Sequence, residues 1–175
     1  MKSEIQREIN KTLAAFSQLF SLFDQDRVNI IPFEGSWTAG QLIQHLIMSN
    51  SGFVKLINGE VKETNRKPDE YVEKIKTAFL DFTTKMQSPD FIRPPMMNYN
   101  KVELMQSLQS LSEEMNQSIE KLDLTKTCIS FELPVFGHLT RWEAIHFVLY
   151  HTQRHIHQLK KIFQIVVERN KVLHP

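Results

Sequence analysis

Apolar residues recur at steps of three and four along most of this chain, which is the spacing of one face of an α-helix. The pattern predicts helices over residues 3–23, 37–57, 100–122 and 140–163, and a shorter one in the first half of residues 69–86. No segment shows the alternation that is typical of a strand. The economical architecture is an all-α, four-helix bundle with long irregular crossovers.

Three of the predicted helices begin with residues that favour a capping box, in which a side chain and a backbone N–H exchange hydrogen bonds. The pairs are Thr38 with Gln41, Asn100 with Glu103, and Thr140 with Glu143. These sequences fix where three of the four long helices should start.

The connecting segments contain most of the helix-breaking residues. Residues 24–35 include Pro32 and Gly35, residues 58–68 are polar, and residues 124–138 are extended or irregular. Residues 88–100 contain three prolines, so they are either a lid over a binding site or a packed crossover, and general loop statistics favour the crossover. Residues 170–175 are expected to form a frayed tail.

Composition indicates a single domain spanning residues 1–175, 41% hydrophobic and 23% charged. The net charge of +1 and the lack of a basic helix face give no support to nucleic-acid binding. No apolar run is long enough to cross a membrane and none resembles a signal peptide, so we expect a cytoplasmic protein. The single cysteine, Cys128, has apolar neighbours and is expected to be a packing residue.

Candidate chemistry is concentrated in residues 140–163, which hold four of the seven histidines. At about 100° per residue, His151 and His155 lie one turn apart on one border of the apolar stripe. His146 and His157 lie beyond the other border and are expected to be exposed or at an interface. Only the first pair has the H-x-x-x-H spacing that lets one metal ion bridge successive turns, although such pairs also occur as ordinary surface or hydrogen-bonded residues.

A third candidate ligand, His45, lies at the border of the apolar face of residues 37–57. Ser49 and Gly52 follow on the same side of that helix, where Gly52 either leaves room beside the imidazole or allows close helix packing. If the two helices are neighbours, His45, His151 and His155 converge. Three neutral ligands would leave a coordination position open for water or substrate.

Three short motifs resemble the DinB-like family of damage-inducible metalloproteins. They are Thr38–His45 (T-x-x-Q-x-x-x-H), Phe136–Thr140 (FGHLT) and His151–Leu159, in the order and spacing of that family. The resemblance implies a four-helix bundle that holds a divalent metal through His45, His151 and His155, and it implies homodimers. The family includes transferases that use low-molecular-weight thiols such as bacillithiol or mycothiol, a thiol-dependent isomerase, and many members of unknown activity.

Four further residues of the last helix and its entry receive smaller roles. His138 could approach the site from the preceding loop, but a role at the start of the helix over residues 140–163 is favoured. Arg154 could bind an anionic substrate group, although a solvated arginine is commoner. Tyr150 and Gln158 are possible hydrogen-bonding partners of the ligands.

Two functions from different classes follow. The first is a metal-dependent thiol S-transferase acting on small electrophilic molecules, or as a variant a hydrolase that activates water, with zinc or nickel as the expected metal. The second is a non-catalytic metal-binding or stress-response protein. No acid, base or nucleophile beyond the histidines can be assigned.

Overall fold

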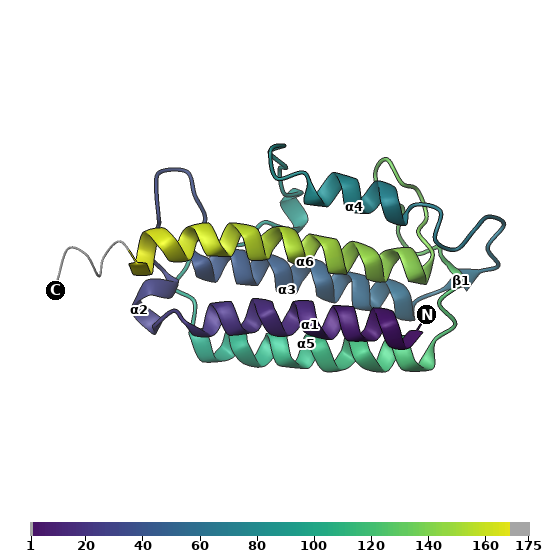
Figure 1. Ribbon diagram of the computed structural model, residues 1–175, viewed down its shortest axis with the longest axis horizontal. Helices are drawn as coiled ribbons and strands as arrows, with labels where there is room; N and C mark the ends of the chain where they lie inside the picture. The colour runs from purple at the N-terminus through teal and green to yellow at the C-terminus, as the bar shows by residue number, and fades with distance from the viewer. Residues whose placement is uncertain (1, 169–175) are drawn as a thin grey trace.

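The predicted four-helix bundle is the observed architecture. The structure, a computed structural model, describes residues 2–168, so the expected tail at 170–175 lies outside the described residues. The bundle consists of α1 (Lys2–Ser21), α3 (Ala39–Asn58), α5 (Lys101–Lys121) and α6 (Arg141–Phe163), as Figure 1 shows.

The connections contain several short elements, some of which the sequence pattern did not predict. A fifth helix, α4 (Val72–Leu80), was expected and packs on the outside of α6. The segment 24–35 contains a one-turn helix, α2 (Gln25–Val28), and the proline-rich segment contains the 3-10 turn η1 (Asp90–Ile92). After α6 the chain continues as the π-helical turn η2 (Gln164–Glu168).

Two very short strands were not predicted. β1 (Val61–Lys62) pairs antiparallel with β2 (Thr127–Cys128). Each strand has only two residues, which is too short to produce a recognisable alternation of polar and apolar side chains.

The order of the bundle is not a simple up-and-down one. α1 and α3 each contact both α5 and α6, so α1 lies diagonally across from α3, and α5 across from α6. Lys2 Nζ, at the start of α1, donates to the Glu120 carbonyl at the end of α5, so these two helices run antiparallel. Arg141 Nε, at the start of α6, donates to the Ile57 carbonyl at the end of α3, so this pair is antiparallel as well. The Asn58 side chain at the end of α3 donates to Ser118 Oγ near the end of α5 at 2.7 Å, so the neighbours α3 and α5 are parallel. Residues 59–100 must therefore return the chain along the whole bundle.

Two of the three predicted capping boxes are present. Thr38 exchanges hydrogen bonds with Gln41, and Thr140 with Glu143. Asn100 accepts from the backbone N–H groups of Val102 and Glu103, but no reciprocal bond from the Glu103 carboxylate occurs among the described contacts, so that box was wrong. Because an asparagine side chain can accept from two backbone donors at once, the helix start is satisfied without the return bond.

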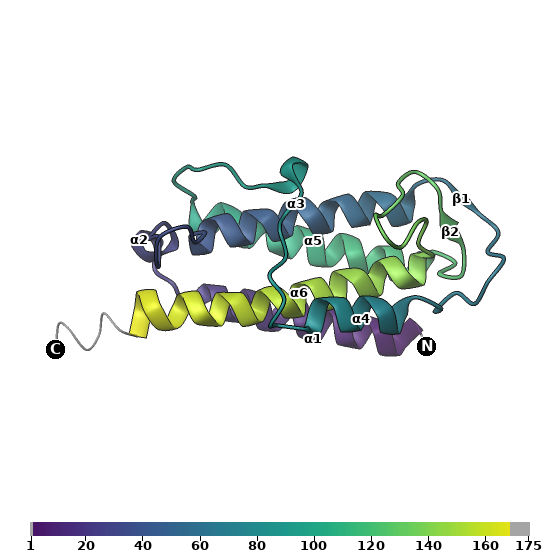
Figure 2. The same cartoon turned by 90° about the horizontal axis from the view of Figure 1, so that it is seen from above.

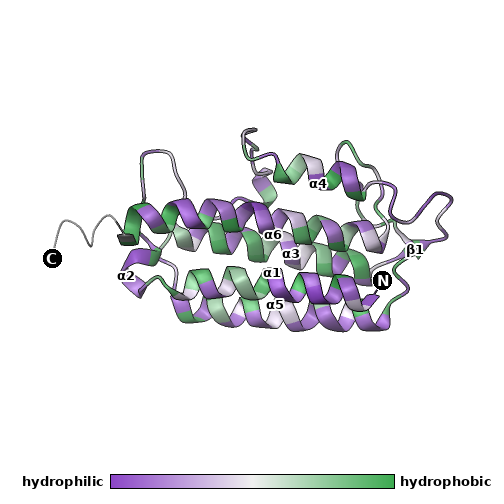
Figure 3. Ribbon diagram, viewed as in Figure 1, coloured by the Kyte–Doolittle hydropathy of each residue, from purple (hydrophilic) through white to green (hydrophobic). Residues whose placement is uncertain are grey.

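The core is divided into two apolar clusters along the bundle. One contains Ile9, Ile57 and Leu149, and the other contains Phe20, Leu42 and Leu159. Between them, buried polar residues face the interior, including Asn50, whose Nδ2 donates to Thr152 Oγ1 at 3.3 Å. In Figure 3 the long helices show both apolar and polar segments on their visible faces, as amphipathic helices in a bundle do.

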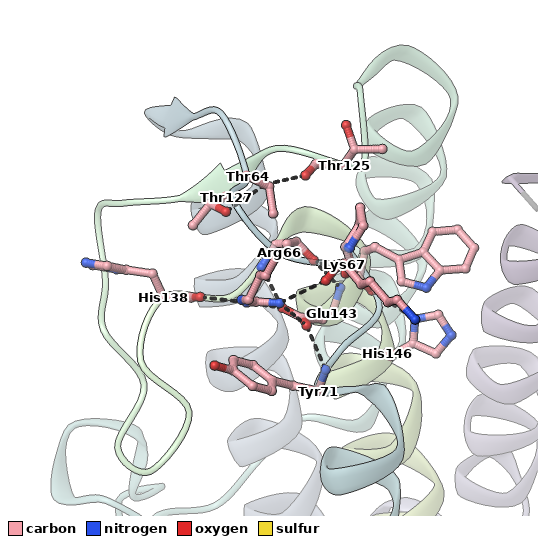
Figure 4. Close-up of polar contacts among 12 residues, drawn as sticks. Thr64, Arg66, Lys67, Tyr71, Thr125, Thr127, His138, Glu143 and His146 are labelled. Carbon is pink, nitrogen blue, oxygen red and sulfur yellow. Dashed lines mark hydrogen bonds and ion pairs between the residues drawn. The ribbon is translucent and has the colours of Figure 1, made fainter.

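One buried ion pair attaches the segment before α4 to the start of α6. Both guanidinium Nη groups of Arg66 donate to the Glu143 carboxylate at 2.6 and 2.7 Å, as Figure 4 shows. The same carboxylate accepts from the backbone N–H groups of Tyr71 and Thr140. The Glu143 side chain is fully buried, so it depends on these four donors in place of water.

Replacing Arg66 with alanine should destabilise the fold by about 3 kcal/mol, because it leaves a buried carboxylate without its cation. Urea unfolding followed by circular dichroism measures the change. Arg27→Ala is the matched control, since the Arg27–Asp24 pair is exposed and should be worth under about 1 kcal/mol. Equal losses in the two variants would contradict this account.

The loop before α6 contains a strained turn. Leu133, Pro134, Val135 and Phe136 form a β-turn in which the Phe136 N–H donates to the Leu133 carbonyl at 3.1 Å. Val135 adopts φ 74°, a conformation that favours glycine and is costly for a β-branched residue. Its side chain is 83% exposed, so it gains little from packing.

Val135→Gly should therefore stabilise the protein by about 1 kcal/mol and raise the melting temperature by roughly 3 °C. Differential scanning calorimetry measures the shift. Val102→Gly is the control, because Val102 is also exposed but lies in α5, where glycine should destabilise. A lower melting temperature for Val135→Gly would show that the turn is not strained as described.

Candidate metal centre

The three predicted ligands converge at mid-bundle. His45 comes from α3, and His151 and His155 come from successive turns of α6. The Nε2 atoms of His45 and His151 lie 3.4 Å apart, and those of His151 and His155 lie 2.8 Å apart. All three side chains are buried, and the candidate ligand atoms lie within 4.8 Å of one another.

Two of the imidazoles are held in a tautomer that leaves Nε2 free. His45 Nδ1 lies 2.9 Å from the Ile92 carbonyl oxygen, and His155 Nδ1 lies 3.1 Å from Gln158 Oε1. A carbonyl oxygen can only accept, so each Nδ1 must be the donor and each Nε2 keeps its lone pair. Two lone pairs therefore point toward His151 in one small buried space, where either the Nε2 proton of His151 or a metal ion can lie between them.

The donor set fits a divalent ion. Three nitrogens at about 2.0–2.1 Å from a tetrahedral ion would lie roughly 3.3 Å from one another. The 3.4 Å spacing of His45 and His151 matches that value, whereas His151 and His155 are closer. His151 Nδ1 is buried without a hydrogen-bond partner in the described part of the chain, so only Nε2 links this ring to its neighbours.

The electrostatic surroundings keep the imidazoles neutral. Burial lowers the pKa of His45, and burial together with the neighbouring histidines and Arg154 lowers the pKa of His151 well below its usual value. For His155, burial, then His45, lower the pKa to about 3. Neutral imidazole is the form that binds metals, so these residues are ready to act as ligands at neutral pH.

Aromatic side chains enclose the cluster. Phe79 of α4 and Phe147 of α6 pack against the His151 ring at centroid distances of 5.4 and 5.6 Å. Trp37, which precedes α3, packs against His45 at 5.1 Å. The three Nε2 atoms therefore lie in a largely apolar setting, which strengthens electrostatic interactions within it.

No carboxylate joins the cluster in the described part of the chain. A groove of about 550 Å³ lies between α1 and α5 and includes none of the three histidines. We take the histidine cluster as the candidate site because its convergent donors have a specific chemistry, whereas the groove is lined by mixed surface side chains.

The proline-rich segment contributes directly to the site. In Figure 2 the chain between α4 and α5 crosses α6 and α3 and places η1 beside α3. The Ile92 carbonyl accepts from His45, and Ser88 Oγ lies 3.4 Å from His45 Nδ1. The segment is thus a crossover that also contacts the candidate ligand His45. Sequence reasoning missed Ile92 because a backbone carbonyl leaves no signature in residue type.

The smaller predictions had mixed outcomes. Gln158 contacts His155 as expected, whereas Tyr150 packs near His146 and makes no described contact with the three histidines. His138 lies in the loop before α6, where its carbonyl accepts from Arg66, in keeping with a role at the helix entry. A Cβ on Gly52 would meet nothing within 4 Å, so close helix packing does not explain that glycine.

Three other expectations need correction or refinement. His146 was expected to be exposed or at an interface but is buried, because Trp142 and Tyr150, one turn away on each side, pack against its ring. His157 is partly covered by Phe82, which stacks on it at 4.3 Å. Arg154 is half-buried and donates to three backbone carbonyls, so it is not the freely solvated arginine that was considered commoner.

Cys128 is a packing residue, as predicted. It is fully buried in the core, and burial raises its pKa to about 11. The reactive thiolate is therefore scarce at neutral pH.

Comparison with known proteins agrees with the fold and with the order of the motifs. The family model of the DinB superfamily matches residues 8–159. The chain belongs to the DinB superfamily. Among curated relatives of this DinB protein, the uncharacterized protein YuaE of Bacillus subtilis (strain 168) is 25% identical over 150 residues, covering 86% of this chain and 91% of YuaE.

A solved structure shares the fold of this DinB protein. YfiT from Bacillus subtilis matches with a TM-score of 0.59 and 15% identity, covering 93% of this chain and 86% of that one. YfiT is described as a probable metal-dependent hydrolase with an unusual four-helix bundle topology. Among the described residues, none of the helices is long and apolar enough to cross a membrane.

Metal binding should quench the fluorescence of Trp37, because its ring packs directly on His45. In a Trp142→Phe variant, Cu²⁺ should reduce the emission and saturate at one ion per chain. Trp37→Phe is the control, because Trp142 lies nine residues before His151, about 13 Å along α6, and should be quenched far less. Equal quenching in both variants, or none, would contradict binding at this cluster.

Proposed function

We propose that this DinB protein binds one divalent metal ion, zinc or nickel, through His45, His151 and His155. We further propose that it is a thiol S-transferase that joins a low-molecular-weight thiol to small electrophiles. The observation that supports this most strongly is the convergence of three neutral, buried Nε2 atoms. An ion bound there would supply Lewis acidity and lower the pKa of a coordinated thiol.

The residues around the cluster have supporting roles in this proposal. The Ile92 carbonyl and Gln158 orient two of the ligands, which is how outer hydrogen bonds usually tune a metal site. Phe79 and Phe147 exclude water from one side of His151. Arg154 adds positive charge near the ligands, which favours an anionic thiolate over a neutral thiol.

No carboxylate belongs to the histidine cluster among the described residues, and we favour thiol transfer because a thiol ionises more readily than water when no base assists it. Hydrolysis normally uses a general base to activate water, and none lies in the cluster. A thiol needs only a lower pKa to become a nucleophile. In the transfer, sulfur bonds to the electrophilic carbon, the leaving group departs with the bonding electrons, and the thiol proton passes to solvent.

A metal-dependent hydrolase is the second candidate. It is suggested by YfiT, which shares the fold and is described as a probable metal-dependent hydrolase. In that case water would take the place of the thiol, and the same three histidines would hold the ion.

The test begins with metal content, measured by elemental mass spectrometry on protein purified without an affinity tag. We expect about one zinc or nickel ion per chain in the wild type and none in His151→Ala. His157→Ala is the matched control, because His157 lies on the same helix outside the cluster and should retain the ion. No ion in the wild type, even after zinc or nickel is added, would overturn the metal site.

Activity is then measured on metal-loaded protein with bacillithiol, mycothiol and other small thiols, each with a small electrophile. Thiol consumption that is absent in His151→Ala would support the transferase. Ester or amide hydrolysis without thiol consumption would favour the hydrolase. A bound ion with neither activity would point to a non-catalytic metal-binding protein.

A further inference from the structure

Arg154 is placed where it can hold the crossover segment against the metal-binding helix. It lies on α6 between His151 and His155 in the sequence. Its Nη1 donates to the carbonyls of Phe79 and Asp81 at 3.1 and 2.8 Å, and its Nη2 donates to the carbonyl of Thr84. One guanidinium thus attaches the end of α4 and the first residues after it to α6.

A short segment connects the carbonyls held by Arg154 to Ile92, which contacts the candidate ligand His45. Ile92 lies eight positions after Thr84, and its carbonyl accepts from His45 Nδ1 at 2.9 Å. Such a segment can span at most about 28 Å when fully extended. A short tether fixed at Thr84 therefore restricts where the Ile92 carbonyl can lie.

The far end of the crossover is fixed independently. Tyr99 is buried, its N–H donates to Asn29 Oδ1 at 2.7 Å, and its carbonyl accepts from Gln25 and Asn29. Its ring lies against the backbone of Gly40, where an added Cβ would lie 2.8 Å from the Tyr99 Cβ. The segment is held firmly on both sides of Ile92, and Arg154 provides the attachment to α6.

We propose that Arg154 is a positioning residue of the metal centre, which acts through residues 79–92 on His45. By fixing the Ile92 carbonyl, it keeps the proton of His45 on Nδ1 and leaves Nε2 free to face His151 and His155. This inference rests on the proposed metal site, yet its first consequence is a property of the metal-free protein. It also explains why an arginine so close to the ligands is turned away from them.

The decisive measurement is the tautomer of His45 in metal-free protein. Two-bond ¹H–¹⁵N correlation spectra distinguish the two neutral imidazole tautomers, and the His45 signals are assigned by comparison with His45→Gln. We expect the Nδ1–H form alone in the wild type and a mixture of both forms in Arg154→Ala. A pure Nδ1–H form in Arg154→Ala would overturn the proposal.

Two further readouts separate positioning from general stability. Hydrogen exchange of peptides covering residues 81–92 should become about tenfold faster in Arg154→Ala, while peptides from α3 and α5 stay unchanged. The zinc dissociation constant, measured by competition with a chelator, should rise about tenfold, as expected when a ligand loses its orienting partner. If Arg154→Ala shows faster exchange but the zinc affinity and His45 tautomer of the wild type, Arg154 only attaches the segment to α6. That result would overturn its role at the metal site.

Control variants keep the test interpretable. Arg154→Lys retains the charge but cannot reach three carbonyls, so it should behave like a milder Arg154→Ala. Arg93→Ala removes a cation that pairs with Asp90 in the same segment, and it should change none of the readouts. If Arg154→Ala fails to fold, Gly40→Ala tests the opposite attachment, because displacing Tyr99 should shift the same His45 tautomer.

Failure of the metal site is distinguishable from failure of this proposal. A wild type that takes up no zinc, but whose His45 tautomer depends on Arg154, would reject the proposed function and uphold the positioning role. If the wild type and Arg154→Ala bind zinc with the same affinity and have the same His45 tautomer, the metal site is upheld and the positioning role of Arg154 is rejected.

Discussion

A neutral imidazole points its bare nitrogen in a fixed direction when its other nitrogen donates a proton to an acceptor, because that hydrogen bond fixes both the tautomer and the ring orientation. Two of the three histidines at mid-bundle have such an acceptor. His45 donates to the Ile92 carbonyl and His155 to Gln158, whereas His151 Nδ1 has no partner among the described residues. The first acceptor, the Ile92 carbonyl, belongs to the connecting segment 59–100, which crosses two helices. The orientation of His45 therefore depends on the path of that segment.

Buried polar groups also divide the core. Two apolar clusters lie on either side of a polar layer in which the Asn50 side chain donates to Thr152. Asn50 Oδ1 and His151 Nδ1 have no partner among the described residues, and an unpaired buried group costs about 1–3 kcal/mol. The apolar clusters at the two ends of the bundle therefore have to offset the cost of the polar layer.

Much of this arrangement could be predicted from residue patterns. The helix faces, the caps at Thr38 and Thr140, and the proximity of His45 to His151 and His155 all follow from local periodicity and from the packing of amphipathic helices. What could not be predicted depends on the backbone. The acceptor for His45 and the three acceptors for Arg154 are carbonyls, which every residue type offers equally. The burial of His146 likewise depends on how Trp142 and Tyr150 turn, which helical spacing alone does not fix.

The diagonal placement of consecutive helices has a consequence for how the chain reaches this state. α1 does not pair closely with α3, nor α5 with α6, and α3 lies parallel to α5 across a long connection. No antiparallel hairpin of neighbouring long helices is therefore available to start assembly.

Nearly every contact between the bundle helices joins residues that are far apart in sequence. His45 and His151, for example, are 106 positions apart. For an all-helical protein this is a high contact order, and it should make folding slow relative to simple up-and-down bundles. Because α6 contacts both α1 and α3, the bundle cannot close during synthesis until residues 141–163 have left the ribosome.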